Sequence, residues 1–258
     1  MRTYKIMSCN LRCDSAGDGK NSFTNRKEYA LERLTEYAPD VIGFQEIQPR
    51  MYDWLIENFS DYSFVGGGRG AKRDDEAVCV AFRRDKFYLC DAETFWLSAT
   101  PDIPGSRYTG DQSGCPRICT SVMLKPRDGE AFRFYNVHTD HVGHVARVLA
   151  ANQVLQKISY DNERSPMPFF VTGDFNATPD DLCIKTMLDY PAVKLVDLAE
   201  KSGGTFHGFG QYVKDEYKID YIFAPADMKL EKLVVCRDMN EDGVFISDHY
   251  PIMADVSF

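Results

Sequence analysis

The stretch Phe-Phe-Val-Thr-Gly-Asp-Phe-Asn, residues 169–176, has the pattern of a buried strand that ends in two polar residues. A short apolar run with few polar interruptions is typical of a strand in the interior of a sheet. Asp174 and Asn176 come directly at its end. In α/β sheets, polar residues at strand ends face the crevice where ligands bind. The segment therefore predicts both a central strand and one corner of a functional site.

Other apolar runs along the chain are flanked by polar residues in the same way. The residues concerned are Asn10, Glu46, His138, Asp220 and the pair Asp248-His249. Taken alone, each is more typical of a turn residue or of a hydrogen-bonded structural histidine. Together they supply carboxylates, amides and imidazoles, which can bind a metal ion or phosphate and can serve one reaction. The recurrence predicts that these strand ends meet in one site.

Strand-like runs are distributed along the whole sequence. They are Tyr4–Asn10, Val41–Gln45, Tyr62–Val65, Val78–Arg83, Phe87–Phe95, Ile118–Lys125, Phe132–His138, Phe169–Gly173, Tyr221–Phe223, Leu230–Val235 and Pro251–Val256. Some are separated by helices and others by short turns, which does not fit one parallel sheet. We expect an α/β (α+β) fold, a four-layer sandwich of two packed mixed β-sheets flanked by helices. No linker or repeat interrupts residues 1–258, so one domain is expected.

Helical spacing of apolar residues occurs between the strands. A first helix is expected through Ala30–Ala38, with Asn25-x-x-Glu28 as a capping box that opens it. A second is expected over residues 145–158. A third should begin at Thr178-Pro179, with the threonine as N-cap and the proline in the first turn.

The charge composition indicates which classes of binding partner and substrate are favoured. The formal net charge is −9, whereas proteins that hold duplex nucleic acid by its backbone normally carry a basic surplus. Strong duplex binding is therefore not expected, and a phosphorylated small molecule, a nucleotide or an oligonucleotide is favoured. The eight cysteines lack zinc spacing and are interpreted as buried free thiols, which suits a reducing compartment.

The cellular location is predicted from the absence of a membrane-spanning segment and of a signal peptide in the sequence. No apolar run approaches the roughly 18 residues of a membrane span. The first residues enter a strand without an apolar signal region. A cytoplasmic monomer is expected, and a secreted form that has lost its signal peptide is the alternative.

The motifs, taken together, resemble those of a known family. They are Phe44-Gln45-Glu46, Asn136-Val137-His138, Gly173-Asp174-Phe175-Asn176, Ile219-Asp220-Tyr221 and Ser247-Asp248-His249. In this order they resemble the successive motifs of the endonuclease/exonuclease/phosphatase superfamily, which has the DNase I-like fold. Gly173–Pro179 looks most like its uncharacterised microbial and deadenylase-like branches. The segment Lys218–Tyr221 departs from the Cys-Asp-Arg signature of inositol polyphosphate phosphatases.

The resemblance implies a role for each residue. Glu46 would be the main Mg²⁺ ligand, with Asn10 beside it and Asp248 nearby, and Mn²⁺ is the alternative ion. The implied catalytic residues are His138, Asp174, Asn176, Asp220 and His249. Asp174 would orient or deprotonate the attacking water. Asp220 and His249 would form a carboxylate–imidazole pair. How the two histidines divide the work stays open.

Two further residues are candidate substrate contacts. Arg117 lies where related sequences place a basic phosphate contact, and a surface strand residue is the alternative. His207, in the aromatic segment Thr205–Phe209, could stack on a base or a sugar, and a loop pinned by its own aromatic side chains is the alternative. The glycine-rich segment Gly66–Gly70 lacks the features of a phosphate-binding loop and is expected to be a mobile loop at the mouth of the cleft.

The predicted function is a Mg²⁺-dependent phosphoesterase that hydrolyses a phosphodiester, or a phosphomonoester, by direct attack of water. A nuclease acting on RNA or DNA ends is an alternative within the same chemistry. An alternative of another class is a non-catalytic module that binds a phosphorylated ligand. Such a module should lack at least one of Glu46, Asp174, Asp220 and His249, and all four are present.

Overall fold

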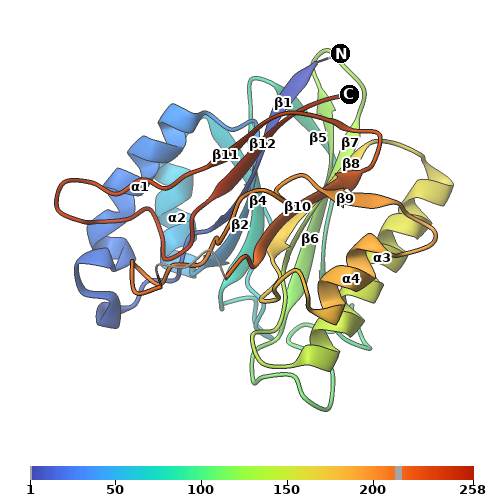
Figure 1. Ribbon diagram of the computed structural model, residues 1–258, viewed down its shortest axis with the longest axis horizontal. Coiled ribbons are helices and arrows are strands. Elements are labelled where there is room, and N and C mark those ends of the chain that lie inside the picture. Colours follow the sequence, from blue (N-terminus) through green and yellow to red (C-terminus); the bar gives the residue numbers. More distant parts are fainter. Residues whose placement is uncertain (1, 213–216) are drawn as a thin grey trace.

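The computed structural model describes residues 2–212 and 217–258. Within these residues the strands form two six-stranded sheets (Figure 1). The first sheet has the order β11 (Lys229–Val235), β12 (Ile252–Ser257), β1 (Thr3–Asn10), β2 (Val41–Ile47), β4 (Ala77–Arg83) and β3 (Tyr62–Val65). The second has the order β5 (Phe87–Trp96), β6 (Ile118–Pro126), β7 (Phe132–His138), β8 (Phe169–Asp174), β10 (Asp220–Pro225) and β9 (Leu195–Asp197).

The two sheets pack face to face, and helices cover both outer faces. Helices α1 (Phe23–Tyr37) and α2 (Pro49–Asn58) lie on the first sheet. Helices α3 (His144–Arg164) and α4 (Leu182–Leu188) lie on the second (Figure 1). A central core of side chains such as Ile6 and Phe134 fills the space between the sheets. This arrangement confirms the predicted four-layer sandwich.

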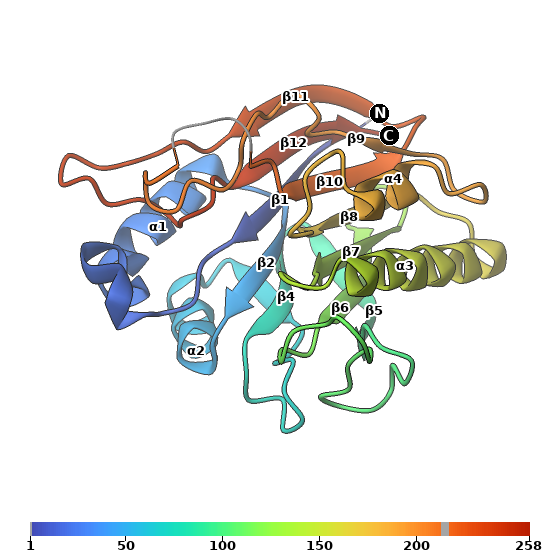
Figure 2. The same ribbon diagram turned by 60° about the horizontal axis from the view of Figure 1, so that its bottom comes forward.

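Strand direction explains how the polar strand ends meet. β1 and β2 pair in parallel, as do β7 and β8, and each parallel pair is joined by a helical crossover. Asn10 therefore ends beside Gln45, and His138 beside Asp174. β10 runs antiparallel to β8, so Asp220 meets the same end from the start of its strand. Figure 2 shows this end of both sheets turned forward.

Residues 248 and 249 also reach this end from the start of a strand. They precede β12, which pairs antiparallel with β1. Asp220, Asp248 and His249 thus belong to strand starts, whereas the sequence pattern grouped them with strand ends. The predicted strands Tyr221–Phe223 and Pro251–Val256 already follow these residues in the chain. What the hydrophobic pattern does not reveal is that both strands run antiparallel to a neighbour, which brings their starts to the end where the other strands finish.

A polar cluster between the sheets, formed by Gln45, Asn136 and Thr172, fixes their relative position. The Asn136 amide nitrogen donates to the carbonyl oxygens of Phe44 (2.8 Å) and Cys79 (2.9 Å) in the opposite sheet. Its amide oxygen accepts from Gln45 Nε2 (2.7 Å) and Thr172 Oγ1 (3.1 Å). The three side chains are fully buried, where unsatisfied polar groups would be costly. The cluster therefore holds the two halves of the strand-end region in register.

Two predicted helix starts are wrong. α1 begins at Phe23, with Ser22 in the N-cap position directly after a short 3-10 segment, Ala16–Asn21. Asn25 lies inside the helix and donates to the Gly19 carbonyl instead of capping the helix start. α4 begins at Leu182, and its N-cap is Asp181, whose carboxylate accepts from Cys183 N at 2.9 Å. Thr178 lies before this cap, because the residues between them form a turn.

Some features were missed or were only partly predicted. α2 has Pro49 in its first turn and buries Met51 and Leu55 at helical spacing, a signal that the sequence does contain. β9, with three residues, is too short to give a pattern. All eight cysteines are unpaired, but only five are buried, because Cys13 and Cys115 are half-buried and Cys90, in β5, is exposed. Across residues 2–212 and 217–258, none of the helices has the length and apolar character to span a membrane.

Candidate active site

The assembled strand ends border a cleft with a volume of about 570 Å³. Seven of the predicted site residues line it, namely Glu46, Arg117, His138, Asp174, Asn176, Asp248 and His249. Asn10 and Asp220 are almost fully buried and contact these residues from behind. The structure therefore brings nine of the ten predicted residues together, and His207 is the exception.

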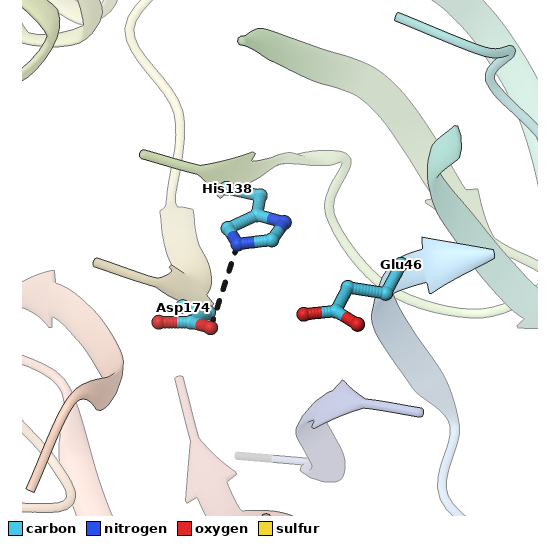
Figure 3. Close-up of side chains that lie close together, drawn as sticks. All are labelled: Glu46, His138 and Asp174. Atoms are coloured by element: carbon cyan, nitrogen blue, oxygen red, sulfur yellow. Dashed lines mark ion pairs between the residues drawn. The ribbon is translucent and has the colours of Figure 1, made fainter. Parts of the chain in front are cut away.

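Asn10 joins the carboxylates of the two sheets. Its amide nitrogen donates to Glu46 Oε1 at 3.0 Å and to Asp174 Oδ2 at 2.9 Å. The second oxygen of Glu46 accepts from the backbone N–H of Cys13 at 3.1 Å. In Figure 3 the carboxylate of Glu46 points across the cleft toward Asp174. The first sheet and the second sheet thus each contribute one carboxylate to the same small volume.

Four residues that line the cleft and are not glycine have left-handed backbone conformations. The φ angles are 63° at Glu46, 52° at Arg12, 47° at Asn176 and 56° at Phe209. For residues other than glycine this conformation costs roughly 1–2 kcal/mol each, and such strain concentrates at functional sites. At Glu46 it coincides with a bulge in the pairing of β2 with β4. The bulge turns the carboxylate into the cleft.

Asp174 stands between two imidazoles. Its Oδ2 atom lies 3.6 Å from His138 Nε2 (Figure 3) and 3.8 Å from His249 Nε2. Its Oδ1 atom accepts from the backbone N–H of Asn176 at 2.8 Å. Burial raises the pKa of Asp174 to about 7, and the neighbouring Asp220 adds to this effect.

The two histidines have opposite electrostatic environments. His249 Nδ1 lies 2.8 Å from Asp220 Oδ2. Burial alone would lower the pKa of His249, but nearby carboxylates, Asp220 first, raise it to about 10, so the ring is cationic at neutral pH. Burial and the charges of Arg117 and Arg69 hold the pKa of His138 well below its usual value, so that ring is neutral.

The donor set suits a hard divalent cation. Ligand atoms of Glu46, His138 and Asp174 lie within 4.8 Å of one another, and two of the three residues offer carboxylate oxygens. Asn10 presents its amide nitrogen to Glu46, so its side-chain amide would have to turn to offer oxygen to an ion. Asp248 reaches the same region through Arg12, which lies 3.6 Å from Asp248 Oδ2 and 3.9 Å from Glu46 Oε2.

Arg117 is buried in the wall of the cleft and is not a surface residue. Its side chain is 4% exposed. Nη2 lies 2.7 Å from His141 Nδ1, and Nε lies 3.5 Å from Asp140 Oδ2. Nη1 is buried and has no hydrogen-bond partner among the residues that the structure describes. A cation with a free donor therefore lines the cleft, which agrees with the predicted phosphate contact and not with the alternative of a surface strand residue.

His207 does not reach the cleft. Its ring is buried, stacks on Tyr250 with 3.9 Å between ring centroids, and accepts from the Gly210 backbone N–H at 3.1 Å. Its neighbours Phe206 and Phe209 line the cleft instead. The structure therefore favours the alternative of a loop held by aromatic side chains, because Tyr250 and Phe245 pack against the imidazole and His207 is not among the residues that line the cleft.

Several cleft residues were not predicted. They include Arg12, Asp18, Arg69, Glu76, His141 and Tyr212. Arg69 belongs to the glycine-rich segment that was expected to be mobile. Its carbonyl accepts from Trp96 Nε1 at 2.6 Å, and its Nη1 lies 2.9 Å from Glu76 Oε2. These contacts fasten the segment to the body of the protein and place Arg69 in the cleft wall.

Two packed mixed sheets, with carboxylates and imidazoles where the strand ends of both sheets meet, define a protein of the DNase I-like class. The model of the Endonuclease/Exonuclease/phosphatase family matches residues 7–249, which is nearly the whole chain. The chain therefore belongs to the endonuclease/exonuclease/phosphatase family, as the motifs predicted. Members of this family are hydrolases that act on phosphate esters.

Individual relatives agree with this assignment. An endonuclease/exonuclease/phosphatase structure from Bacteroides vulgatus is 28% identical, with a TM-score of 0.91 and full coverage of both chains. A mannosyl-6-phosphatase from Bacteroides thetaiotaomicron is also 28% identical, with a TM-score of 0.91 over 99% of this chain and 100% of that one. Nocturnin from Xenopus laevis is 23% identical in an alignment of 209 positions that covers 70% of this chain. The chain spans about half (49%) the length of that curated relative.

Proposed function

We propose that the protein is a metal-dependent phosphoric ester hydrolase that transfers a phosphoryl group directly to water. The observation that carries the proposal is the position of Asp174, whose Oδ2 atom lies within 4 Å of one neutral and one cationic imidazole. Glu46 faces it across the cleft (Figure 3). An acceptor for a proton and donors for phosphoryl oxygens thus share one pocket, as water attack on phosphorus requires.

Glu46, with Asn10 and Asp248, would hold Mg²⁺, or Mn²⁺ in its place. When bound, the ion would neutralise charge on the phosphoryl oxygens and make phosphorus easier to attack. The carboxylate and amide groups fit this role because Mg²⁺ prefers oxygen ligands. This assignment follows the donor chemistry of the site.

The side chains of the protein accept the proton, donate hydrogen bonds to the phosphoryl group and position the reactants. Asp174 accepts a proton from the attacking water, whose oxygen forms a bond to phosphorus. The ester P–O bond breaks, and the departing alkoxide takes a proton from solvent. The cationic ring of His249, oriented by Asp220, donates from Nε2 to a phosphoryl oxygen. His138 and Asn176 hold the phosphoryl group or the water in line.

The class of substrate is a phosphorylated small molecule. The net charge of −9 disfavours a long polyanion, and the mannosyl-6-phosphatase relative is named for a sugar phosphate ester. Hydrolysis at RNA or DNA ends is the second candidate function, supported by the deadenylase-like motif at Gly173–Pro179. The non-catalytic alternative is disfavoured because Glu46, Asp174, Asp220 and His249 are all in place.

Removing divalent metal should abolish hydrolysis. With p-nitrophenyl phosphate and bis-p-nitrophenyl phosphate as substrates, EDTA should stop product release, and excess Mg²⁺ or Mn²⁺ should restore it. Mg²⁺ should also raise the Tm of the protein, because a ligand that binds only the folded state stabilises it. Glu46→Gln should lose most of this Tm increase.

The matched control for this prediction is Glu57→Gln, which removes an exposed carboxylate from α2. It should keep both the Mg²⁺-dependent increase in Tm and the activity. Hydrolysis that survives thorough chelation would refute the metal assignment. An unchanged increase in Tm in Glu46→Gln would show that the ion binds elsewhere.

A further inference from the structure

A group of cationic side chains lies on one wall of the cleft. Arg69 comes from the loop after β3, Arg117 from the residue before β6, and His141 from the loop after β7. Both guanidinium groups are at least nine-tenths buried. These three residues, here called the cationic wall, line the same cleft as His138 and lie close enough for their charges to act on its imidazole.

Arg117 is the member of the cationic wall whose charge is least compensated. Its nearest carboxylate, Asp140, is 3.5 Å away, and that distance is long for a charged hydrogen bond. Asp140 is already engaged, because it accepts from Ser113 Oγ (2.5 Å) and from backbone N–H groups including that of Gly143 (2.8 Å). Arg117 Nη1 is left with no acceptor in the described part of the chain.

A buried charged donor without a partner is costly, typically by about 1–3 kcal/mol or more. It is retained most readily where a ligand completes its hydrogen bonds. Arg69 adds positive potential, although its own donors are paired with Glu76 and Asp75. Burial lowers the pKa of His138 and of His141, and the positive charges of Arg117 and Arg69 lower both pKa values further.

The chemistry of phosphate esters decides which ligand fits. A monoester carries about −1.5 to −2 charge near pH 7 and has three terminal oxygens. A diester carries one negative charge and has two terminal oxygens, with a second carbon-bearing oxygen in place of the third. An uncharged ester oxygen beside Arg117 would satisfy the guanidinium poorly. A third anionic oxygen would satisfy it well.

We propose that Arg117, supported by Arg69 and His141, forms an anion subsite that selects phosphate monoesters over diesters. The inference rests on the proposed function and specifies its substrate class. The subsite receives the third terminal oxygen of the phosphoryl group, while Asp174 and His249 act on the opposite side. The substrate is then a terminal phosphate on an alcohol such as a sugar or nucleoside hydroxyl.

The test compares two substrates that have the same leaving group. For the Mg²⁺-loaded full chain, kcat/KM is measured with p-nitrophenyl phosphate and with bis-p-nitrophenyl phosphate. Arg117→Gln should lower the monoester-to-diester ratio of kcat/KM by roughly 10- to 100-fold, the value of a charged hydrogen bond. Arg117→Lys should recover part of the ratio. Arg164→Gln, which removes an exposed charge at the end of α3, should leave the ratio unchanged.

A binding measurement keeps the test independent of turnover. Inorganic phosphate should raise the Tm of the wild-type chain more than dimethyl phosphate does, and Arg117→Gln should abolish that difference. Equal losses of kcat/KM for both esters, together with equal Tm increases from both anions, would overturn the subsite. If the wild-type chain hydrolyses neither ester, the proposed function itself fails, whereas a preference for the diester refutes only the subsite.

Discussion

Replacing His249 with glutamine should lower kcat by roughly 10²- to 10³-fold, as expected for the loss of a positioned donor to a phosphoryl oxygen. Glutamine can donate a hydrogen bond, but it cannot carry the positive charge that Asp220 stabilises at 2.8 Å. Nε2 of the native ring lies 3.8 Å from Asp174, within reach of the same phosphoryl group. The loss should therefore appear in kcat more than in KM. Initial rates at saturating Mg²⁺ measure it.

Asp220→Asn should reproduce most of this loss, because it removes the carboxylate that keeps the His249 ring charged and oriented. The matched control is His144→Gln, which changes an imidazole whose side chain is 80% exposed at the start of α3. It should change kcat by less than about twofold, since exposed sites tolerate substitution. A near-normal kcat in a folded His249→Gln variant would remove this residue from the mechanism.

Replacing Gly43 with alanine should destabilise the fold by about 3 kcal/mol or more, the upper end for overpacking a core. Gly43 lies in β2 against the polar cluster between the sheets. A Cβ atom there would overlap Thr172 Oγ1 and would lie 2.5 Å from Asn136 Oδ1. To make room, the sheets must separate or the cluster must give up hydrogen bonds. Denaturant unfolding of the variant measures the free energy lost.

The same substitution should lower kcat/KM in the molecules that remain folded. Glu46 lies in β2, whereas His138 and Asp174 end strands of the opposite sheet. A shift between the sheets changes the distance across the cleft, to which catalysis is sensitive. The matched control is Gly67→Ala, where an added Cβ meets no atom within 4 Å. Equal stability of the two variants would show that the sheets can move apart at little cost.

Most of the fold could be predicted because strand periodicity survives in buried apolar runs. The pattern around residues 169–176 identified β8, and the mixture of helical and short-turn connections indicated two mixed sheets, although it did not say which strands pair in parallel. Helix starts were less predictable. Several polar residues can cap the same turn, and tertiary contacts chose Asp181 over Thr178.

The site was predictable as a set of residues but not in its detail. Nothing in the sequence indicates that Glu46 adopts a left-handed conformation at a bulge. Nor does it show that Arg12, two positions after Asn10, pairs with carboxylates from both ends of the chain. His207 shows the converse limit. An aromatic and histidine-bearing loop suggests stacking on a ligand, yet here the imidazole stacks on Tyr250.

The placement of β12 sets the order in which the protein can become functional during its synthesis. This strand lies between β11 and β1, and Asp248 and His249 come just before it. A nascent chain that already includes Asn10 and Glu46 still lacks the cationic imidazole and the strand that flanks β1. Because chains emerge from the ribosome in sequence order, turnover cannot begin until residues 248–257 have been released. Ribosome-bound fragments that end before this segment should be catalytically silent.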